Sequence, residues 1–218
     1  MSALPLVLVL PPDHGGNDRV DMMPMARPQP RLLFVRNFLA NPRGIGSMVP
    51  SSRRLTRRLL AGVDWSAAKI IVEYGPGTGV VTRAILAQMT PDARLFAFEI
   101  NDDFVAFLHR TITDPRLTII AASAESVATV LCAKGIDHCD AAISSLPFSI
   151  MPPRVRLRIL LATAKMLVPG AALVGYQYST RWLRELRRSF GDVEVRFEPR
   201  NWPPAFVFTA RREAPAAR

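Results

Sequence analysis

The sequence predicts a doubly wound α/β domain, in which a mostly parallel sheet lies between helices and ends in an antiparallel hairpin. Three observations predict this fold. Five short apolar segments alternate with helical patterns, and a glycine-rich turn follows the first of them. Two further apolar segments come near the end of the chain, and the residues that join them are too few to form a helix. At 218 residues, the chain is long enough for one such domain and too short for two.

Strands and helices are expected to alternate from residue 70 onward. Buried apolar runs indicate parallel strands, and amphipathic periods between them indicate helices. In chain order we expect strand 70–72, helix 80–89, strand 95–100, helix 103–112, strand 117–121, helix 125–134, strand 140–144, helix 153–167, strand 172–178 and helix 182–190. The strands 193–197 and 206–210 follow, and they must pair antiparallel because only the proline-rich segment 199–204 separates them.

The first 62 residues differ from the rest of the chain. Six prolines within residues 1–30 indicate a flexible leader. Residues 31–40 form an amphipathic helical pattern, and Ser51 or Ser52 is expected to cap a second helix that carries Leu55, Leu59 and Leu60. We therefore divide the chain into a leader (1–30), a basic amphipathic segment (31–62), the α/β domain (63–212) and a tail (213–218).

Composition and charge limit the functional class. Apolar residues make up 49% of the chain, which is typical of a folded protein, and no apolar run reaches the roughly 18 residues of a membrane-spanning helix. The net charge of +10 favours a phosphate-bearing partner, either nucleic acid or an anionic membrane. Cys132 and Cys139 lack metal-ligand spacing, so we expect reduced thiols, a cytoplasmic protein and no metal.

A glycine-rich turn joins the strand 70–72 to the next helix. It reads Glu73-Tyr74-Gly75-Pro76-Gly77-Thr78-Gly79. Glycine permits positive φ and a close approach of the backbone to a ligand, and Glu99 ends the next strand, where its carboxylate can accept hydrogen bonds from ribose hydroxyls. The alternatives are a plain tight turn or a NAD site. NAD sites usually carry G-x-G-x-x-G, however, and an anion such as Glu73 would repel a pyrophosphate.

With Glu99, the segment from Val72 to Gly79 resembles motif I of the class I S-adenosylmethionine-dependent methyltransferases, which have a Rossmann-like sheet. The resemblance extends from about Arg31 to Arg211. It implies that Glu73, Gly75 and Gly77 line the methionine end of S-adenosylmethionine and that Glu99 holds the ribose. It also assigns cofactor contacts to Thr78, Gly79, Ile100, Ala124, Glu125 and Ser145.

Glu125 has two interpretations. The family resemblance places it beside the adenine, although many members have Asp at that position. Alternatively, Glu125 simply begins the next helix, which Ser123 would cap.

Two subfamilies with a Gly-Pro-Gly loop suggest different substrates. Ribosomal RNA adenine dimethyltransferases carry Asn-Leu-Pro-Tyr after the fourth strand, whereas this chain has Ser145-Leu146-Pro147-Phe148. A longer stretch is similar to the bacterial phospholipid N-methyltransferases, through the segments 34–39, 50–52, 75–80, 145–147 and 177–178. That resemblance implies successive methylation of phosphatidylethanolamine to phosphatidylcholine by a peripheral enzyme on the cytoplasmic face of the membrane. We also expect the protein to be a monomer. We assign substrate contacts to Leu146, Pro147, Phe148 and Arg181, and ribosomal RNA is the alternative substrate.

The basic segment is the predicted membrane-docking part of the chain. No acidic residue lies between Asp21 and Asp64, while eight arginines do. Basic residues near an anionic surface contribute roughly 1 kcal/mol each, and apolar side chains that enter the bilayer add to this. We predict membrane contacts for Phe34, Phe38, Arg53, Arg54, Arg57 and Arg58. Packing of the apolar arc on the domain itself, or RNA binding by the arginines, would be the alternatives.

The sequence contains no obvious general base. Tyr176 and Tyr178 end the fifth strand at the ligand-binding edge of the sheet, and we expect them to face opposite sides, so that one alone reaches the site. We choose Tyr178 as the catalytic residue, in contact with the substrate amine, and Tyr176 as the second candidate. Phe148 fits a site position and a core position equally well, whereas Trp202 is expected in the core.

Overall fold

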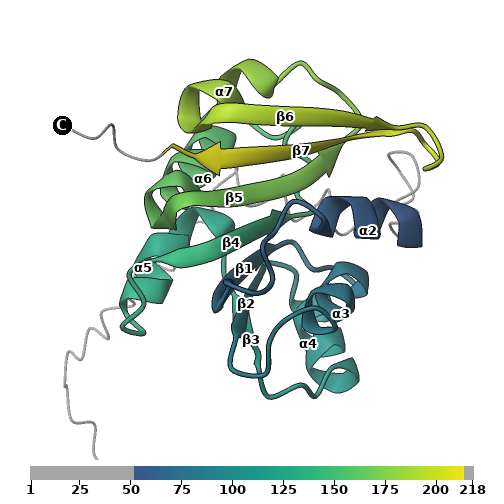
Figure 1. The fold of residues 1–218 in the computed structure, drawn as a ribbon. Coiled ribbons are helices and arrows are strands. Elements are labelled where there is room, and N and C mark those ends of the chain that lie inside the picture. The colour runs from purple at the N-terminus through teal and green to yellow at the C-terminus, as the bar shows by residue number, and fades with distance from the viewer. Residues whose placement is uncertain (1–51, 214–218) are drawn as a thin grey trace, which may run out of the picture.

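The computed structural model describes residues 52–213, in which seven strands form one sheet with the order β3-β2-β1-β4-β5-β7-β6 (Figure 1). Parallel pairing joins the first five strands, and β7 pairs antiparallel with both β5 and β6. The elements are α2 (Arg53–Leu60), β1 (Ile70–Tyr74), α3 (Val80–Leu86), β2 (Arg94–Glu99), α4 (Asp102–Thr111), β3 (Leu117–Ala121), the 3₁₀ helix η1 (Ala124–Ser126), α5 (Val127–Cys132), β4 (Cys139–Ser144), α6 (Pro153–Met166), β5 (Leu167–Gln177), α7 (Leu183–Phe190), β6 (Gly191–Glu198) and β7 (Ala205–Arg212). The predicted fold class is confirmed.

Strand β5 begins five residues before the expected start at residue 172. Cys139 of β4 pairs with Leu167, but Ala141 pairs with Ala172, so the residues between these two partners bulge out of the regular register. Pro169 and Gly170, which has φ of 82°, lie within this bulge. Because this stretch is irregular, the apolar period alone does not predict that the strand begins at residue 167.

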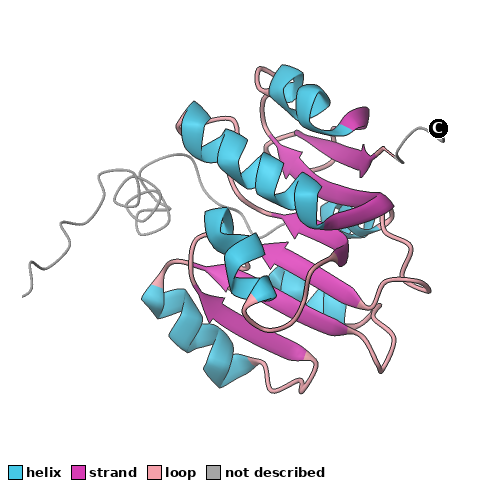
Figure 2. Ribbon diagram, turned by 90° about the vertical axis from the view of Figure 1, so that its left-hand side faces the viewer, coloured by secondary structure: helices cyan, strands magenta, loops and turns pink. Residues whose placement is uncertain are grey.

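Helices cover both faces of the sheet (Figure 2). Leucines of α2 and apolar residues of α3 pack with Ile71, Leu95 and Ile143 on one face. On the other face α5, α6 and α7 enclose Val72, Phe96 and other inward-facing residues. The nearly continuous apolar sequence of the central strands reflects burial on both sides.

Helix α2 belongs to the first of these layers. Ser52 is its N-cap, as predicted, because its Oγ accepts a hydrogen bond from the backbone N–H of Leu55 at 3.1 Å. Leu55, Leu59 and Leu60 are completely buried, so this helix packs its apolar side on the domain. Phe34, Phe38, Ser51, the helix expected at 31–40 and the leader 1–30 lie outside the described residues, as do the last five residues of the tail.

Trp202 is not a core residue, so that expectation is wrong. Its side chain is 81% exposed, because it lies in the loop between β6 and β7, and no helix or strand within residues 52–213 covers it. Trp182 occupies the core instead. Its ring lies 5.2 Å from Phe148 and 5.1 Å from Phe208, measured between centroids.

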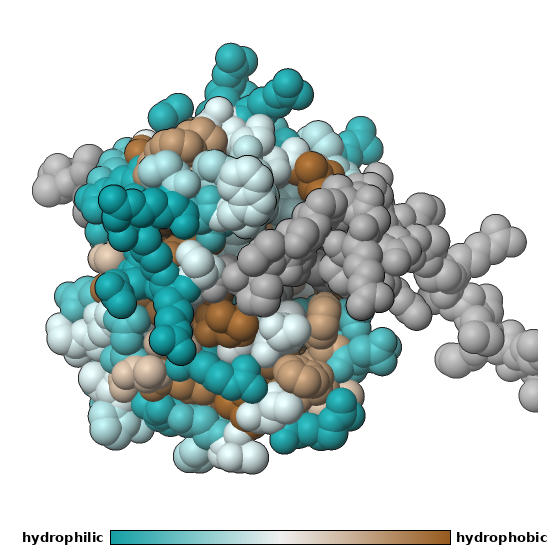
Figure 3. All heavy atoms as spheres, turned by 90° about the vertical axis from the view of Figure 1, so that its right-hand side faces the viewer, coloured by the Kyte–Doolittle hydropathy of each residue, from teal (hydrophilic) through white to brown (hydrophobic). Residues whose placement is uncertain are grey.

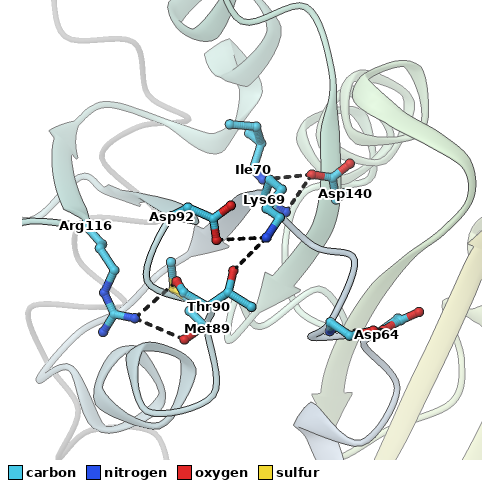
Figure 4. Close-up of polar contacts among 9 residues, drawn as sticks. Asp64, Lys69, Ile70, Met89, Thr90, Asp92, Arg116 and Asp140 are labelled. Carbon is cyan, nitrogen blue, oxygen red and sulfur yellow. Dashed lines mark hydrogen bonds and ion pairs between the residues drawn. The ribbon is translucent and has the colours of Figure 1, made fainter.

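The parallel strands begin at one edge of the sheet, here called the amino edge, and end at the other, the carboxyl edge. At the amino edge, the backbone N–H groups of Lys69 and Ile70 donate to one oxygen of Asp140 at 2.9 and 2.8 Å (Figure 4). The Lys69 ammonium bonds Asp92 and Thr90. These contacts hold the starts of β1 and β4 together, so we expect the residues of the amino edge to contribute to stability.

No helix within residues 52–213 is long and apolar enough to cross a membrane.

Candidate functional site

The glycine turn lies at the carboxyl edge, between β1 and α3. Gly75, Gly77 and Gly79 have φ of 69°, 55° and 78°, which other residues rarely adopt, so the sequence needs glycine at each. The N–H of Gly75 donates to the carbonyl of Phe98 on β2 at 2.9 Å. This bond fixes the turn against the neighbouring strand.

The three glycines differ in what surrounds them. A Cβ built on Gly75 would lie 2.9 Å from the Leu146 side chain, and one on Gly79 would lie 2.8 Å from Leu108. A Cβ on Gly77 would meet nothing within 4 Å. Gly77 therefore faces free space, as a residue that lines a ligand site must, while Thr78 is exposed beside it.

Glu73 is the unusual residue of β1. Its side chain is completely buried, and neither carboxylate oxygen has a hydrogen-bond partner among residues 52–213. Burial raises the pKa of Glu73 to about 8. The nearby Thr82 hydroxyl opposes this rise, and the charge of Glu99 adds to it. A buried carboxyl without a partner is costly, so this position fits a cationic group such as the ammonium of an amino acid.

Glu99 lies at the end of β2 and is 1% exposed. One oxygen accepts from the backbone N–H of Gly77 at 3.1 Å, and the other accepts from Ile100 and Asn101 at 2.8 and 3.0 Å. Burial raises the pKa of Glu99, while the three N–H donors limit the rise. The carboxylate thus orders the glycine turn and keeps acceptor capacity for a further hydroxyl.

The segment after β3 begins with a helix cap. Ser123 Oγ accepts from the N–H of Glu125 at 3.2 Å and so caps η1, which contains the buried Ala124. The Glu125 carboxylate forms an ion pair with Arg158 of α6. The backbone of Glu125 therefore lies in the first turn of a capped helix, as one of the two interpretations expected. The contact of Glu125 with adenine stays a prediction.

The turn after β4 lies beside the glycine turn. The N–H of Ser145 donates to the carbonyl of Tyr74 at 3.0 Å, and Leu146 reaches Gly75 as described above. Pro147 is half-buried. Phe148 is completely buried and packs on Trp182, so of its two interpretations the structure favours the core position.

Two residues that are not among the predicted site residues hold this turn in place. Gln177 accepts a hydrogen bond from the N–H of Ser149 at 3.1 Å and donates to the carbonyl of Leu146 at 2.7 Å. Arg156 donates to the carbonyl of Phe148 at 2.7 Å and forms an ion pair with Glu185 of α7. The sequence signal that could have indicated Gln177 is a glutamine at the end of an otherwise apolar strand. Arg156 depends on contacts between distant elements and had no local signal.

Replacing Gln177 with Met should disturb the turn without changing the volume of the side chain much. Two backbone groups would lose their partners, so we expect the free energy of unfolding to fall by about 1–3 kcal/mol. Turnover should fall further than the loss of folded protein explains, with cofactor affinity little changed. Asp140→Asn, which weakens a similar side chain to backbone contact at the amino edge, is the control. Equal specific turnover in both folded variants would contradict a positioning role for Gln177.

The tyrosines at the end of β5 lie together, which corrects the expectation that they face opposite sides. Their ring centroids are 6.0 Å apart in an edge-on arrangement. Residues i and i+2 of a strand share a face, and this rule places both rings on one side. Tyr176 is half-buried and Tyr178 is 47% exposed, so Tyr178 is the more accessible to a substrate.

The Tyr178 hydroxyl is a weak acid. Partial burial and the neighbouring Tyr176 raise the pKa of Tyr178 to about 12, although a hydrogen bond with Asn201 lowers it. The phenol therefore keeps its proton at neutral pH, and its hydroxyl can donate or accept a hydrogen bond. Arg181 follows it on the surface, exposed.

A groove of about 720 Å³ runs between α2 and α3. Arg53, Arg57 and Arg83 line it together with apolar residues that include Leu60 and Val80, the first residue after the glycine turn. Cationic and apolar walls side by side suit an amphiphilic anion.

The strand order, the glycine turn after β1 and the acidic residue that ends β2 define the fold of the class I S-adenosylmethionine-dependent methyltransferases. The chain is similar to the ornithine lipid N-methyltransferase of Singulisphaera acidiphila, with 29% identity over 182 residues that cover 82% of this chain and 94% of the relative. The resemblance to lipid N-methyltransferases seen in the sequence therefore fits a curated relative of almost the same extent. No family model matches the chain.

Solved structures confirm the fold. The 1,6-didemethyltoxoflavin-N1-methyltransferase of Burkholderia thailandensis, solved with bound S-adenosylhomocysteine, has a TM-score of 0.62 at 17% identity, over 88% of this chain and 93% of its own. A ribosomal RNA methylase of Streptococcus thermophilus has a TM-score of 0.54 at 18% identity, over 72% and 94% of the two chains. The predicted cofactor, S-adenosylmethionine, agrees with this fold, whereas the substrates of such neighbours differ too widely to indicate one.

Proposed function

We propose that the protein transfers methyl groups from S-adenosylmethionine to the amine of a membrane lipid, and that the lipid is phosphatidylethanolamine, which is methylated in successive steps to phosphatidylcholine. The observation that carries the proposal is the similarity to a lipid N-methyltransferase over most of both chains. The cationic groove beside the glycine turn supports a substrate whose headgroup contains an anionic group, such as the phosphate of this lipid.

The residues of the carboxyl edge fit the proposed cofactor. Glu73 would pair with the ammonium of its methionine part, Gly77 would line it closely, and Glu99 would accept from its ribose. When bound, S-adenosylmethionine supplies a methyl group on a positively charged sulfur, which makes that methyl electrophilic. The turn from Ser145 to Pro147 would border the substrate.

Methyl transfer to an amine is a displacement that depends on alignment and desolvation, so the protein has chiefly to position an unprotonated nitrogen. Tyr178 would supply a hydrogen-bond partner and an aromatic face for that nitrogen. The ring face also suits the ammonium that forms as methyl groups accumulate. Because its pKa is raised to about 12, Tyr178 would not itself limit the rate below about pH 10.

Tyr178→Phe should lower turnover on lipid about 10- to 100-fold and leave the affinity for S-adenosylhomocysteine near that of the wild type, because only the hydroxyl is removed. Tyr176→Phe is the matched control, since it removes the neighbouring hydroxyl on the same face. Turnover rates and calorimetric affinities of both variants provide the measurement. If Tyr176→Phe is the slower enzyme, the roles of the two residues are exchanged.

Ornithine lipid is the second candidate substrate, because the curated relative carries that name. Both lipids present a primary amine at the headgroup, so one site chemistry serves either. Ribosomal RNA is less favoured, since Ser145 stands where the RNA enzymes have Asn and lacks the paired donor and acceptor of an amide.

The basic segment 31–62 and a location at the cytoplasmic face of the membrane belong to this proposal. Of its described arginines, Arg53 and Arg57 are exposed and line the groove. Arg54 and Arg58 bind Glu198 but remain 51% and 38% exposed, so all four contribute to the field outside the protein.

Expression in a bacterial host whose membrane contains phosphatidylethanolamine but no methylated lipid tests the substrate. We expect phosphatidylcholine and its mono- and dimethyl precursors to appear in the lipid extract. The same extract from a host that also makes ornithine lipid separates the two candidates. An unchanged lipid profile at good expression would reject the proposal.

A further inference from the structure

The loop between β6 and β7 displays aromatic side chains to solvent. Trp202 is 81% exposed and Phe197, at the end of β6, is 51% exposed. Tryptophan is usually well buried because of its large apolar surface, so an exposed one, with a second exposed aromatic residue five positions earlier in the chain, indicates an interaction surface. We call the loop 199–204, with Phe197 and the adjacent side of α2, the hairpin-tip surface.

Buried polar residues hold the loop in a defined shape. Glu198, 1% exposed, accepts from Arg58 at 2.8 Å, from Arg54 at 3.4 Å and from the N–H of Arg200 at 3.0 Å. Asn201, 6% exposed, donates to the carbonyl of Pro203 at 2.8 Å. Trp202 is therefore presented outward by residues that are themselves fixed.

The surface is also cationic. Residues 52–60 and 197–204 carry five arginines, and Glu198 is their single acidic residue. Burial raises the pKa of Glu198, but the N–H of Arg200 and the charges of Arg58 and Arg54 outweigh burial and leave the pKa below its usual value. Glu198 is thus ionised at neutral pH and offsets one positive charge, which leaves a clear excess to attract an anionic surface.

The hairpin-tip surface lies at the same edge of the sheet as the candidate site. Phe206, at the start of β7, pairs with Gln177 at the end of β5, and Asn201 contacts the Tyr178 hydroxyl. Figure 1 shows the hairpin turn and α2 at one end of the molecule, and Figure 3, which views that end, shows apolar residues set among hydrophilic ones. A partner bound here would border the entrance to the site.

We propose that the hairpin-tip surface docks on an anionic lipid bilayer, with Trp202 inserted at the headgroup level and the surrounding arginines on the lipid phosphates. Tryptophan and arginine both favour this interface, because each joins an apolar body to a polar group. The inference rests on the proposed lipid substrate. It adds that a structured loop of the catalytic domain, and not the segment 31–51 alone, binds the membrane.

Tryptophan emission and vesicle sedimentation test the docking directly. The chain has three tryptophans: Trp182 is buried, Trp65 is half-buried and Trp202 is exposed. With vesicles of phosphatidylglycerol and phosphatidylcholine, we expect the emission of the wild type and of Trp65→Phe to shift to shorter wavelength, and brominated lipid to quench it. Trp202→Ala should bind these vesicles about tenfold more weakly, with an unchanged circular dichroism spectrum.

Three results would overturn the docking. The first is that Trp202→Ala sediments with the vesicles to the same extent as the wild type. The second is that the emission of the bound wild-type protein does not shift. The third result would be that Trp202→Ala weakens the binding of single-stranded RNA but not of vesicles, which would make this an RNA-binding surface.

Methyl transfer in two lipid environments separates this inference from the proposed function. On phosphatidylethanolamine dispersed in detergent micelles, Trp202→Ala should match the wild type, and on anionic vesicles it should be slower. If the wild type fails to methylate the micellar lipid, the proposed function is wrong. If it succeeds there and the variant is equally fast on vesicles, only the docking inference is wrong.

Discussion

Glu73→Gln should stabilise the protein without cofactor at alkaline pH. In the unfolded chain this carboxyl titrates near its ordinary value of 4.5, and in the folded protein near 8. Between these pH values the folded state binds one more proton, so the free energy of unfolding falls as pH rises. The wild type should lose about 3–5 kcal/mol between pH 5 and pH 9 from this group, and the variant should not.

The comparison is made within each protein, from pH 5 to pH 9, by urea unfolding. The cost of burying an unpaired amide then cancels, because it is present at both pH values. Parallel pH profiles for the two proteins would show that Glu73 is solvated or already paired in the folded state.

The same substitution should weaken cofactor binding. An ion pair with the ammonium of S-adenosylhomocysteine requires the ionised carboxylate, so at pH 7 the wild type should release about one proton on binding, and at pH 9 almost none. Calorimetry in buffers of different ionisation enthalpy measures this number. Glu73→Gln should release no proton and bind about 10- to 100-fold more weakly. A wild type that binds tightly without proton release would show that Glu73 stays neutral in the complex.

Glu99→Ala should have the second large effect. It removes the proposed acceptor for the ribose and also the partner of the N–H groups of Gly77, Ile100 and Asn101. We expect a loss of about 1.5–3 kcal/mol in S-adenosylhomocysteine affinity from bonds to a charged acceptor. The melting temperature should fall as well, because the glycine turn loses its anchor.

Asp103→Ala is the matched control, because it deletes an exposed acidic residue of α4 a few positions along the chain. Its affinity should equal that of the wild type. If Glu99→Ala also binds normally, the ribose lies elsewhere or the ligand is a different molecule.

The features predicted best from the sequence are those fixed by local pattern. The glycine turn needs positive φ at three alternate positions, and Ser52 and Ser123 cap helices through contacts two or three residues away. Such constraints appear in the sequence itself. The alternation of buried strands and amphipathic helices likewise determines which edge of the sheet carries the site.

The features that were missed depend on contacts between distant parts of the chain. Arg156 reaches the turn after β4 and Glu185 at once, and Gln177 bridges two backbone groups of the same turn. In the core, Trp182 packs between Phe148 and Phe208, whereas Trp202 lies exposed in the loop between β6 and β7. Composition and period do not predict which aromatic residue is buried. The shared face of Tyr176 and Tyr178, in contrast, follows from the rule that residues i and i+2 of a strand lie on one face.

The most direct test of the account is methyl transfer by the purified protein. It is incubated with S-adenosylmethionine labelled in the methyl group and, separately, with phosphatidylethanolamine, ornithine lipid and ribosomal RNA, and the product is located by mass spectrometry. We predict label on the headgroup nitrogen of phosphatidylethanolamine, with up to three methyl groups added, and labelling about 10- to 100-fold slower after Glu73→Gln at limiting cofactor. Label in ribosomal RNA, with both lipids unchanged, would contradict it.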